Sequence, residues 1–144
     1  MSFPGEQTVT IAAAVLLDGV GRMLVVKKRG SPYFMQPGGK IEEAETPIAA
    51  LVRELAEEVS LALPDDVAPL GVFSAPAANE PETTVVAHIF SARTNRQPRI
   101  GREIEAMAWL DPAAPGDIVL APLTRDHMLP LARRLATQFA GELR

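Results

Sequence analysis

A nearly continuous apolar stretch begins at residue 8. Residues 8–17 are rich in Val, Ile and Leu, which predicts a strand buried on both of its faces. The aspartate and glycines that follow are turn formers, and residues 22–28 return to the pattern of a strand. The two segments together therefore predict a β-hairpin. Residues 30–40 contain two prolines and three glycines, so we expect a loop there.

The spacing of apolar positions becomes helical after residue 45. Thr46 followed by Pro47 is typical of a helix start, because threonine caps free N–H groups and proline fits the first turn. Apolar residues then recur three and four positions apart, at Ile48, Leu51, Val52, Leu55 and Val59. This spacing predicts a helix that packs an aliphatic face inward and ends near Ser60.

The second half of the chain alternates strands with polar connections. Residues 67–73, 83–92 and 104–110 have the composition of strands. We expect a loop at residues 75–81, which contain prolines, and a polar connection at residues 93–102.

A second helix is predicted at the C-terminus. Apolar residues return to helical spacing from about Asp126 onward. Pro130 is tolerated if Asp126 lies near the start of the helix, because the first turn needs no N–H from that residue. The order of strands, helix, strands and helix predicts an α/β domain with helices packed against a mixed sheet.

Length and composition exclude several classes of protein. The 144 residues suit a single domain, which we expect to span residues 1–144. The net charge of −4 argues against an extended nucleic-acid-binding surface. Without cysteine the chain has no disulfide framework, which fits a reducing compartment. The N-terminus lacks the pattern of a signal peptide and no apolar run is long enough to span a bilayer, so we expect a cytoplasmic protein.

Three glutamates stand out on the first predicted helix. Glu54, Glu57 and Glu58 are three and four positions apart, so they are neighbours on the helix surface and repel one another. The last two also lie near the negative end of the helix dipole. A solvated acidic face is one explanation. A hard divalent cation such as Mg²⁺ is the other, because it binds carboxylates and would remove the repulsion. The neighbouring pair Gly38-Gly39 favours the cation, since its backbone can approach an ion closely.

The spacing of these residues matches a known motif. Five residues separate Gly39 from Glu45, seven more precede the run RELAEE at 53–58, and Leu61 closes the pattern. This arrangement resembles the Nudix box of the Nudix hydrolases, and the chain is similar to the MutT-like members of that family. One fixed position differs, because Ser60 stands where the box has a glycine.

The resemblance implies an α/β Nudix fold, in which a mixed β-sheet is sandwiched between helices. It implies hydrolysis of a pyrophosphate bond in a nucleoside diphosphate linked to another moiety, with Mg²⁺, or Mn²⁺ in its place, as cofactor. The partner would be a small-molecule nucleotide, with (d)NTP clean-up as the leading hypothesis, and family members are often homodimers. The alternative function is a nucleotide-binding or regulatory module without hydrolysis. Such modules typically lose box carboxylates, and this chain keeps them all.

The resemblance also assigns the site residue by residue. The metal ligands would be Gly39 through its backbone, Glu54, Glu57, Glu58 and, from the segment before the last strand, Glu103. The catalytic residues would be Glu54 as the general base, Glu58 and Arg53. We expect Arg53 to orient a carboxylate, with Glu45 as its partner. Glu105 is the close competitor of Glu103 for the outer ligand position.

Two basic residues are candidates for binding the substrate. Lys40 follows the glycine pair, where family members often contact a phosphate. Arg29 ends the basic run at residues 27–29, which is otherwise the solvated end of a strand. Among the aromatic residues, Tyr33, Phe34 and Phe73 would line a base pocket or pack in the core, and Trp109 is expected in the core.

Overall fold

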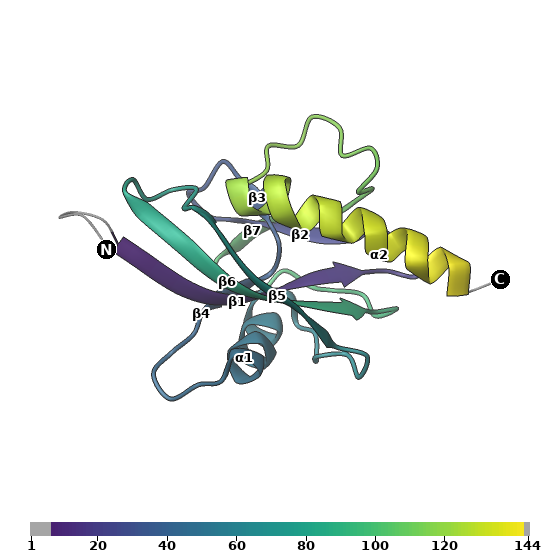
Figure 1. Ribbon diagram of the computed structural model, residues 1–144, viewed down its shortest axis with the longest axis horizontal. Coiled ribbons are helices and arrows are strands. Elements are labelled where there is room, and N and C mark those ends of the chain that lie inside the picture. Colours follow the sequence, from purple (N-terminus) through teal and green to yellow (C-terminus); the bar gives the residue numbers. More distant parts are fainter. Residues whose placement is uncertain (1–6, 143–144) are drawn as a thin grey trace.

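Strand β1 (Gln7–Leu17) lies at the centre of a mixed sheet in the computed structural model, which describes residues 7–142 (Figure 1). It pairs in parallel with β6 (Thr83–Arg93) and antiparallel with β2 (Met23–Lys28). Alternate residues of β1 belong to two different cores. Ala12, Ala14 and Leu16 are fully buried on one face, and Ala13, Val15 and Leu17 on the other. The predicted strand is confirmed, and it is buried on both faces from Ala12 to Leu17, whereas Thr8 and Thr10 are exposed.

The remaining strands extend the sheet on both sides of β1. The main path runs β3-β2-β1-β6-β5, where β3 is Phe34–Met35 and β5 is Ala68–Pro76. Two further strands lie off this path: β4 (Gly38–Lys40) pairs with β1, and β7 (Ile104–Leu110) pairs with β2. The predicted hairpin of the first two strands is confirmed, because Leu17 of β1 faces Met23 of β2.

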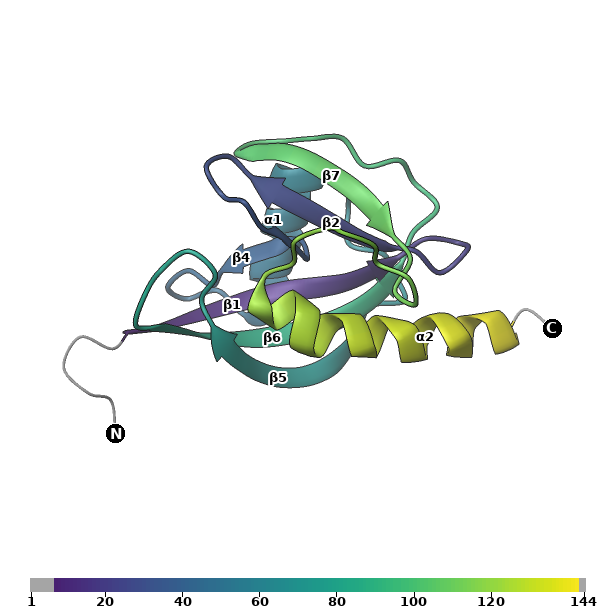
Figure 2. The same ribbon diagram turned by 90° about the horizontal axis from the view of Figure 1, so that it is seen from above.

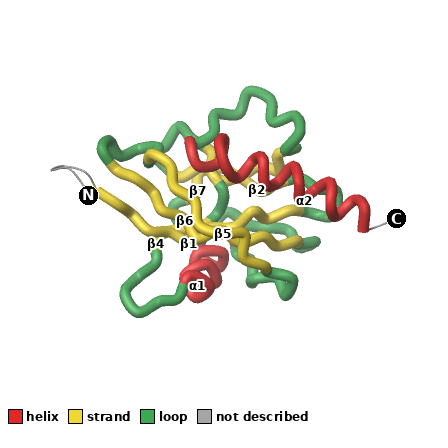
Figure 3. Tube along the Cα trace, viewed as in Figure 1, coloured by secondary structure: helices red, strands yellow, loops and turns green. Residues whose placement is uncertain are grey.

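Two helices cover opposite faces of this sheet. Helix α1 (Pro47–Val59) packs on one face and α2 (Leu129–Glu142) on the other (Figure 3). Seen from above, α2 runs along the sheet over β1 and β6 (Figure 2). The predicted fold class, a mixed β-sheet between helices, is therefore confirmed. No helix within residues 7–142 is both long and apolar enough to cross a membrane.

Helix α1 begins and ends where the sequence indicates. The Thr46 hydroxyl accepts a hydrogen bond from the Ala49 N–H at 3.1 Å, which caps the first turn. Ser60 ends the helix in the left-handed conformation, with φ 58° and ψ 37°. Its N–H donates to the carbonyl of Leu55. Ser60 thus adopts, with a side chain, the backbone geometry that usually selects glycine.

Replacing Ser60 with glycine is expected to stabilise the protein by up to about 1 kcal/mol, because glycine adopts positive φ without a steric penalty. The Ser60 side chain is exposed, so little packing is lost. Chemical denaturation of the two proteins measures the difference. If the Ser60→Gly variant has equal or lower stability, the hydroxyl contributes more than the strain costs.

Residues 30–40 contain more regular secondary structure than predicted. The expected loop contains two short strands, β3 and β4, and β4 pairs with β1. The prolines and glycines of this segment signal a loop, yet its backbone hydrogen bonds complete the sheet. The next strand also continues beyond its predicted end, since β5 extends to Pro76 at the sheet edge, where a missing N–H is tolerated.

The C-terminal helix begins earlier than predicted. Residues 122–123 are already helical, and a π-helical turn, η1 (Thr124–Met128), leads into α2. In this turn the Leu129 N–H donates to the Thr124 carbonyl, five residues back. Pro130 therefore lies inside a continuous helical segment. The wider π-turn accommodates its ring and its missing N–H, so Asp126 is not needed as the start of the helix.

Candidate active site

Helix α1, strand β4 and the segment before β7 line a cleft of about 420 Å³. The residues that line it are Lys28, Gly39, Lys40, Glu42, Arg53, Glu54, Glu57, Glu58, Arg102 and Glu103. Every predicted site residue is in this set except Arg29. The spacing of the box in the sequence therefore corresponds to one continuous surface.

The glycine pair of β4 fits tightly between β1 and α1. A Cβ atom on Gly38 would lie 2.3 Å from the Ala12 carbonyl oxygen, and Gly38 has φ 147°. A Cβ atom on Gly39 would lie 2.5 Å from the carboxyl carbon of Glu54. These approaches are closer than real Cβ contacts allow. The two glycines thus hold β4 against β1 and leave room for the Glu54 carboxylate beside the strand.

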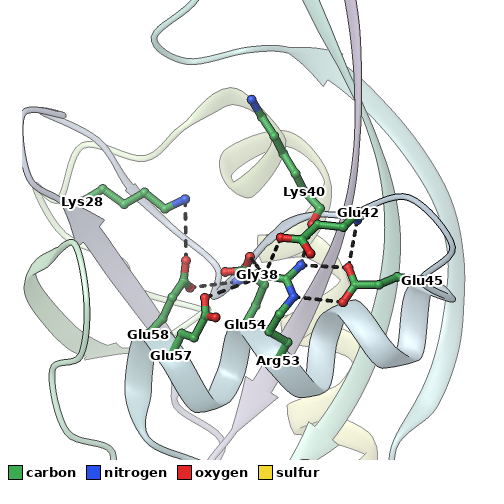
Figure 4. A network of polar contacts seen from close by, with 9 residues as sticks. All are labelled: Lys28, Gly38, Lys40, Glu42, Glu45, Arg53, Glu54, Glu57 and Glu58. Carbon is green, nitrogen blue, oxygen red and sulfur yellow. Dashed lines mark hydrogen bonds and ion pairs between the residues drawn. The ribbon is translucent and has the colours of Figure 1, made fainter.

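Arg53 fixes two carboxylates at the edge of the cleft (Figure 4). Its Nε and Nη2 atoms each lie 2.9 Å from one oxygen of Glu45, and its Nη1 lies 2.7 Å from Oε1 of Glu54. Nη2 also donates to the Lys40 carbonyl at 3.0 Å. The guanidinium holds the pKa of the Glu45 carboxyl at about 2. The structure thus brings Arg53 together with Glu45, the partner expected from the sequence, and the contact is bidentate.

Glu58 is the buried member of the acidic set, with its side chain 5% exposed. Its Oε1 accepts the Gly38 N–H at 3.0 Å, and its Oε2 lies 3.6 Å from Nζ of Lys28. Burial raises the pKa of Glu58 to about 7, although the Lys28 cation and the Gly38 N–H oppose that rise. An ionised carboxylate at this depth requires a nearby positive charge.

Lys28 also lines the cleft, although the sequence does not single it out as a candidate. In the sequence it belongs to the basic run at residues 27–29, whereas the structure separates the members of that run. Lys27 pairs with Glu105 of β7, and Lys28 points into the cleft above Glu58 (Figure 4). Arg29 is exposed and is not among the residues that line the cleft. The sequence does carry one signal for this difference between Lys27 and Lys28: successive residues of a strand face opposite sides of the sheet.

The two competing outer carboxylates lie in different surroundings. Glu103 lines the cleft, in the turn that precedes β7. Glu105 lies within β7 and forms an ion pair with Lys27. The geometry therefore favours Glu103 over Glu105 for a role beside the box glutamates.

The donor set of the cleft suits a hard divalent cation. All of its candidate ligands are oxygens, and Glu58 is a buried carboxylate that such an ion would stabilise. Within residues 7–142, however, no three acidic or histidine side chains already converge as metal ligands. The Nη1 atom of Arg53 lies 2.7 Å from Glu54 and 3.7 Å from Glu57. The candidate ligands therefore line one cleft without converging on one point.

An apolar pocket of about 230 Å³ adjoins the cleft. Lys28, Gly39 and Lys40 line both cavities, so β4 separates them. The wall of the apolar pocket includes Val9, Ile11, Met35, Val85 and Leu123, with Gln36 and Asn79 as polar members. In the described part of the chain no aromatic side chain lines it.

The aromatic residues considered for a base pocket lie elsewhere. Phe34 and Phe73 pack against the core beneath α2, and Trp109 packs against the core beneath α1. Tyr33 is half-buried and is not among the residues that line the apolar pocket. Packing, the other role considered for Phe34, Phe73 and Trp109, is the one that the structure shows.

Comparison with known proteins gives the family. Residues 7–134 match the family model of the NUDIX domain. The chain is 36% identical over 84 residues to an ADP-ribose pyrophosphatase of Methanocaldococcus jannaschii, covering 54% of this chain and 48% of that protein. It is 49% identical over 57 residues to an RNA pyrophosphohydrolase of Halorhodospira halophila, covering 40% and 31%. The chain thus spans less than half the length of these curated relatives.

A solved structure agrees over nearly the whole chain. The crystal structure of a MutT NUDIX hydrolase from Burkholderia pseudomallei superposes with a TM-score of 0.68 at 26% identity. The match covers 90% of this chain and 98% of that one. Together with the box residues gathered in the cleft, these similarities show that the chain belongs to the Nudix family.

Proposed function

We propose that this chain hydrolyses a pyrophosphate bond in a nucleoside diphosphate linked to another moiety, and that it requires Mg²⁺, with Mn²⁺ as a substitute. The observation that carries the proposal is the cleft itself. Three glutamates of α1, the Gly39 backbone and Arg53 line one space. That combination supplies oxygen ligands for a hard cation beside two lysines that suit phosphate.

The residues of the cleft divide into three roles. Glu54, Glu57, Glu58, Glu103 and the Gly39 carbonyl would hold the metal, which when bound would neutralise charge developing on the phosphate oxygens. Arg53 keeps Glu54 beside Gly39 through its 2.7 Å hydrogen bond. We assign Glu54 as the base that takes the proton of the attacking water. Lys28 and Lys40 would bind the phosphates.

The apolar pocket suits the organic part of such a substrate. It adjoins the cleft across β4, and both lysines line the two cavities. A phosphate chain held by Lys28 and Lys40 would therefore leave its nucleoside within reach of the aliphatic wall. Gln36 and Asn79 provide hydrogen-bonding groups on that wall.

A hydrolysis panel tests the proposed function and its substrate. ADP-ribose is the first compound to assay, because one relative is named for it, followed by RNA 5′ ends and the (d)NTPs of the clean-up hypothesis. We expect metal-dependent cleavage, giving AMP and ribose 5-phosphate from ADP-ribose. Tight nucleotide binding without hydrolysis at any metal concentration would instead support the alternative, a nucleotide-binding module.

Replacing Glu103 with alanine is expected to lower activity at least tenfold at limiting Mg²⁺, with partial rescue at high Mg²⁺, because an outer ligand is lost. Glu105→Ala is the matched control, since Glu105 lies two residues away and pairs with Lys27. We expect it to change little. Mg²⁺ titrations of both variants decide the assignment. The opposite pattern would give the role to Glu105, and two silent variants would remove both residues from the metal site.

We also propose that residues 1–144 act as one domain on small nucleotides, in keeping with the net charge of −4. The homodimer and the cytoplasmic location stay predictions. Size-exclusion chromatography with light scattering measures the oligomeric state and so tests the homodimer.

A further inference from the structure

The last turn of helix α1 is covered by a distant piece of backbone, residues 99–102, which we call the strap. Three N–H groups of the strap donate to three carbonyls of that turn. The pairs are Arg99 with Val59 at 2.9 Å, Gly101 with Glu58 at 2.8 Å, and Arg102 with Glu57 at 3.0 Å. Carbonyls in the last turn of a helix have no partner within the helix. The strap therefore satisfies the helix end that carries two of the proposed metal ligands.

Gly101 allows this contact because it lacks a side chain. A Cβ atom at this position would lie 2.0 Å from the Glu57 carbonyl oxygen and 3.1 Å from that of Glu58. These are backbone atoms of a helix, so they cannot turn away as a flexible side chain would. Any other residue at position 101 would push the strap away from the end of α1.

The strap leads directly to Glu103. The Ile104 N–H lies 3.4 Å from the Gly101 carbonyl, which closes a turn with Arg102 and Glu103 at its centre. Glu103 has φ 64°, a left-handed conformation that is unusual for a residue with a side chain. Its carbonyl accepts the Arg29 N–H at 2.9 Å. Glu103 is thus held in a strained conformation between the strap and the end of β2, and it lines the cleft.

We infer that Gly101 is a positioning residue that acts through Glu103. Its contact with the end of α1 sets the position of the Glu103 carboxylate relative to Glu57 and Glu58, two carboxylates of the same cleft. This inference rests on the proposed metal-dependent function. On this inference the strap does more than cap the helix. It fixes the position of Glu103 relative to α1, so that Glu103, Glu57 and Glu58 would face a bound ion together.

Mn²⁺ binding, followed by the electron paramagnetic resonance signal of the free ion, tests the inference without turnover. We expect Gly101→Ala to weaken Mn²⁺ binding at least fivefold while circular dichroism stays native. The matched control is Gly19→Ala, because a Cβ atom at Gly19 would meet nothing within 4 Å and Gly19 lacks positive φ. Its Mn²⁺ affinity should stay within twofold of the wild type. Equal affinities of Gly101→Ala and the wild type would overturn the inference.

The double variant Gly101→Ala/Glu103→Ala separates positioning from general damage. If Gly101 acts through Glu103, the double variant should bind Mn²⁺ as Glu103→Ala does, since displacing a missing carboxylate costs nothing further. If the losses of Mn²⁺ affinity in the two single variants add in the double variant, Gly101 acts independently of Glu103, and the proposal is overturned.

A second pair of variants decides the question if Gly101→Ala fails to fold. Arg102→Pro removes the N–H that reaches Glu57, at a turn position where proline is common, and Arg102→Ala keeps that N–H. We expect weaker Mn²⁺ binding in the proline variant than in the alanine variant, and equal binding would overturn the inference. A wild-type protein that neither binds Mn²⁺ nor hydrolyses any substrate would overturn the proposed function as well. A wild type that does both, beside unaffected variants, would overturn the inference alone.

Discussion

Replacing Glu58 with glutamine is expected to lower kcat at least ~10²-fold while the fold persists. The amide keeps the size of the side chain, and its oxygen can still accept the Gly38 N–H, which now lies 3.0 Å from Glu58 Oε1. What is lost is the negative charge, which would bind the metal ion and which faces Lys28 at 3.6 Å. Steady-state kinetics at saturating Mg²⁺ measures the loss.

Glu43→Gln is the matched control for this substitution. Glu43 carries the same chemical group in the loop before α1, but it is exposed and is not among the residues that line the cleft. Its replacement should leave kcat unchanged. Near wild-type turnover of Glu58→Gln would remove Glu58 from the proposed site, whatever the control shows.

The sequence predicts which residues line the cleft because the box is local. Gly39, Glu45 and residues 53–58 are close in the chain, and one helix cap and one helical period place their side chains. The central strands are predictable for the same kind of reason. Both faces of β1 are apolar, so the pattern alone indicates a strand covered on both sides.

The features that the sequence does not predict depend on distant contacts. Strand alternation separates Lys27 from Lys28, but the pairing of β2 with β7 decides which of the two faces the cleft: Lys27 meets Glu105, and Lys28 meets Glu58. The strand character of β4 comes from its pairing with β1, whose residues 11–13 lie far earlier in the sequence. The π-turn before Pro130 is not predictable from the general rule that proline breaks a helix interior, because that rule assumes regular α-helical hydrogen bonding.

The negative charge at the end of α1 is compensated by groups from three parts of the chain. Nη1 of Arg53 donates a hydrogen bond to the Glu54 carboxylate and lies 3.7 Å from that of Glu57. Lys28 from β2 faces Glu58. The strap directs N–H dipoles at the carbonyls of the last turn. The helix therefore tolerates three adjacent carboxylates before any metal binds. The unfavourable part of this arrangement is the burial of Glu58, whose neighbouring cation, Lys28, lies 3.6 Å away.

The metal-free protein is expected to lose about 2–3 kcal/mol of stability between pH 5 and pH 8 through Glu58. Burial raises the pKa of this carboxyl from 4.5 to about 7 on folding, so the folded state binds more protons than the unfolded state between those values. The free energy of unfolding therefore falls as pH rises through this range. Glu45 contributes little in this range, because Arg53 lowers its folded pKa to about 2, and in the unfolded state a carboxyl of pKa 4.5 is already mostly ionised above pH 5.

Urea denaturation with chelator at several pH values measures the effect, and Glu58→Gln is its reference. The difference between wild type and variant removes the titration of all other groups, so the wild type should lose stability relative to the variant as pH rises. Mg²⁺ should reverse the trend in the wild type alone, because the ion replaces the proton on Glu58. A stability difference that stays constant from pH 5 to pH 8 would contradict a raised pKa at Glu58. In that case Lys28 and the Gly38 N–H would be sufficient to keep the buried carboxylate ionised.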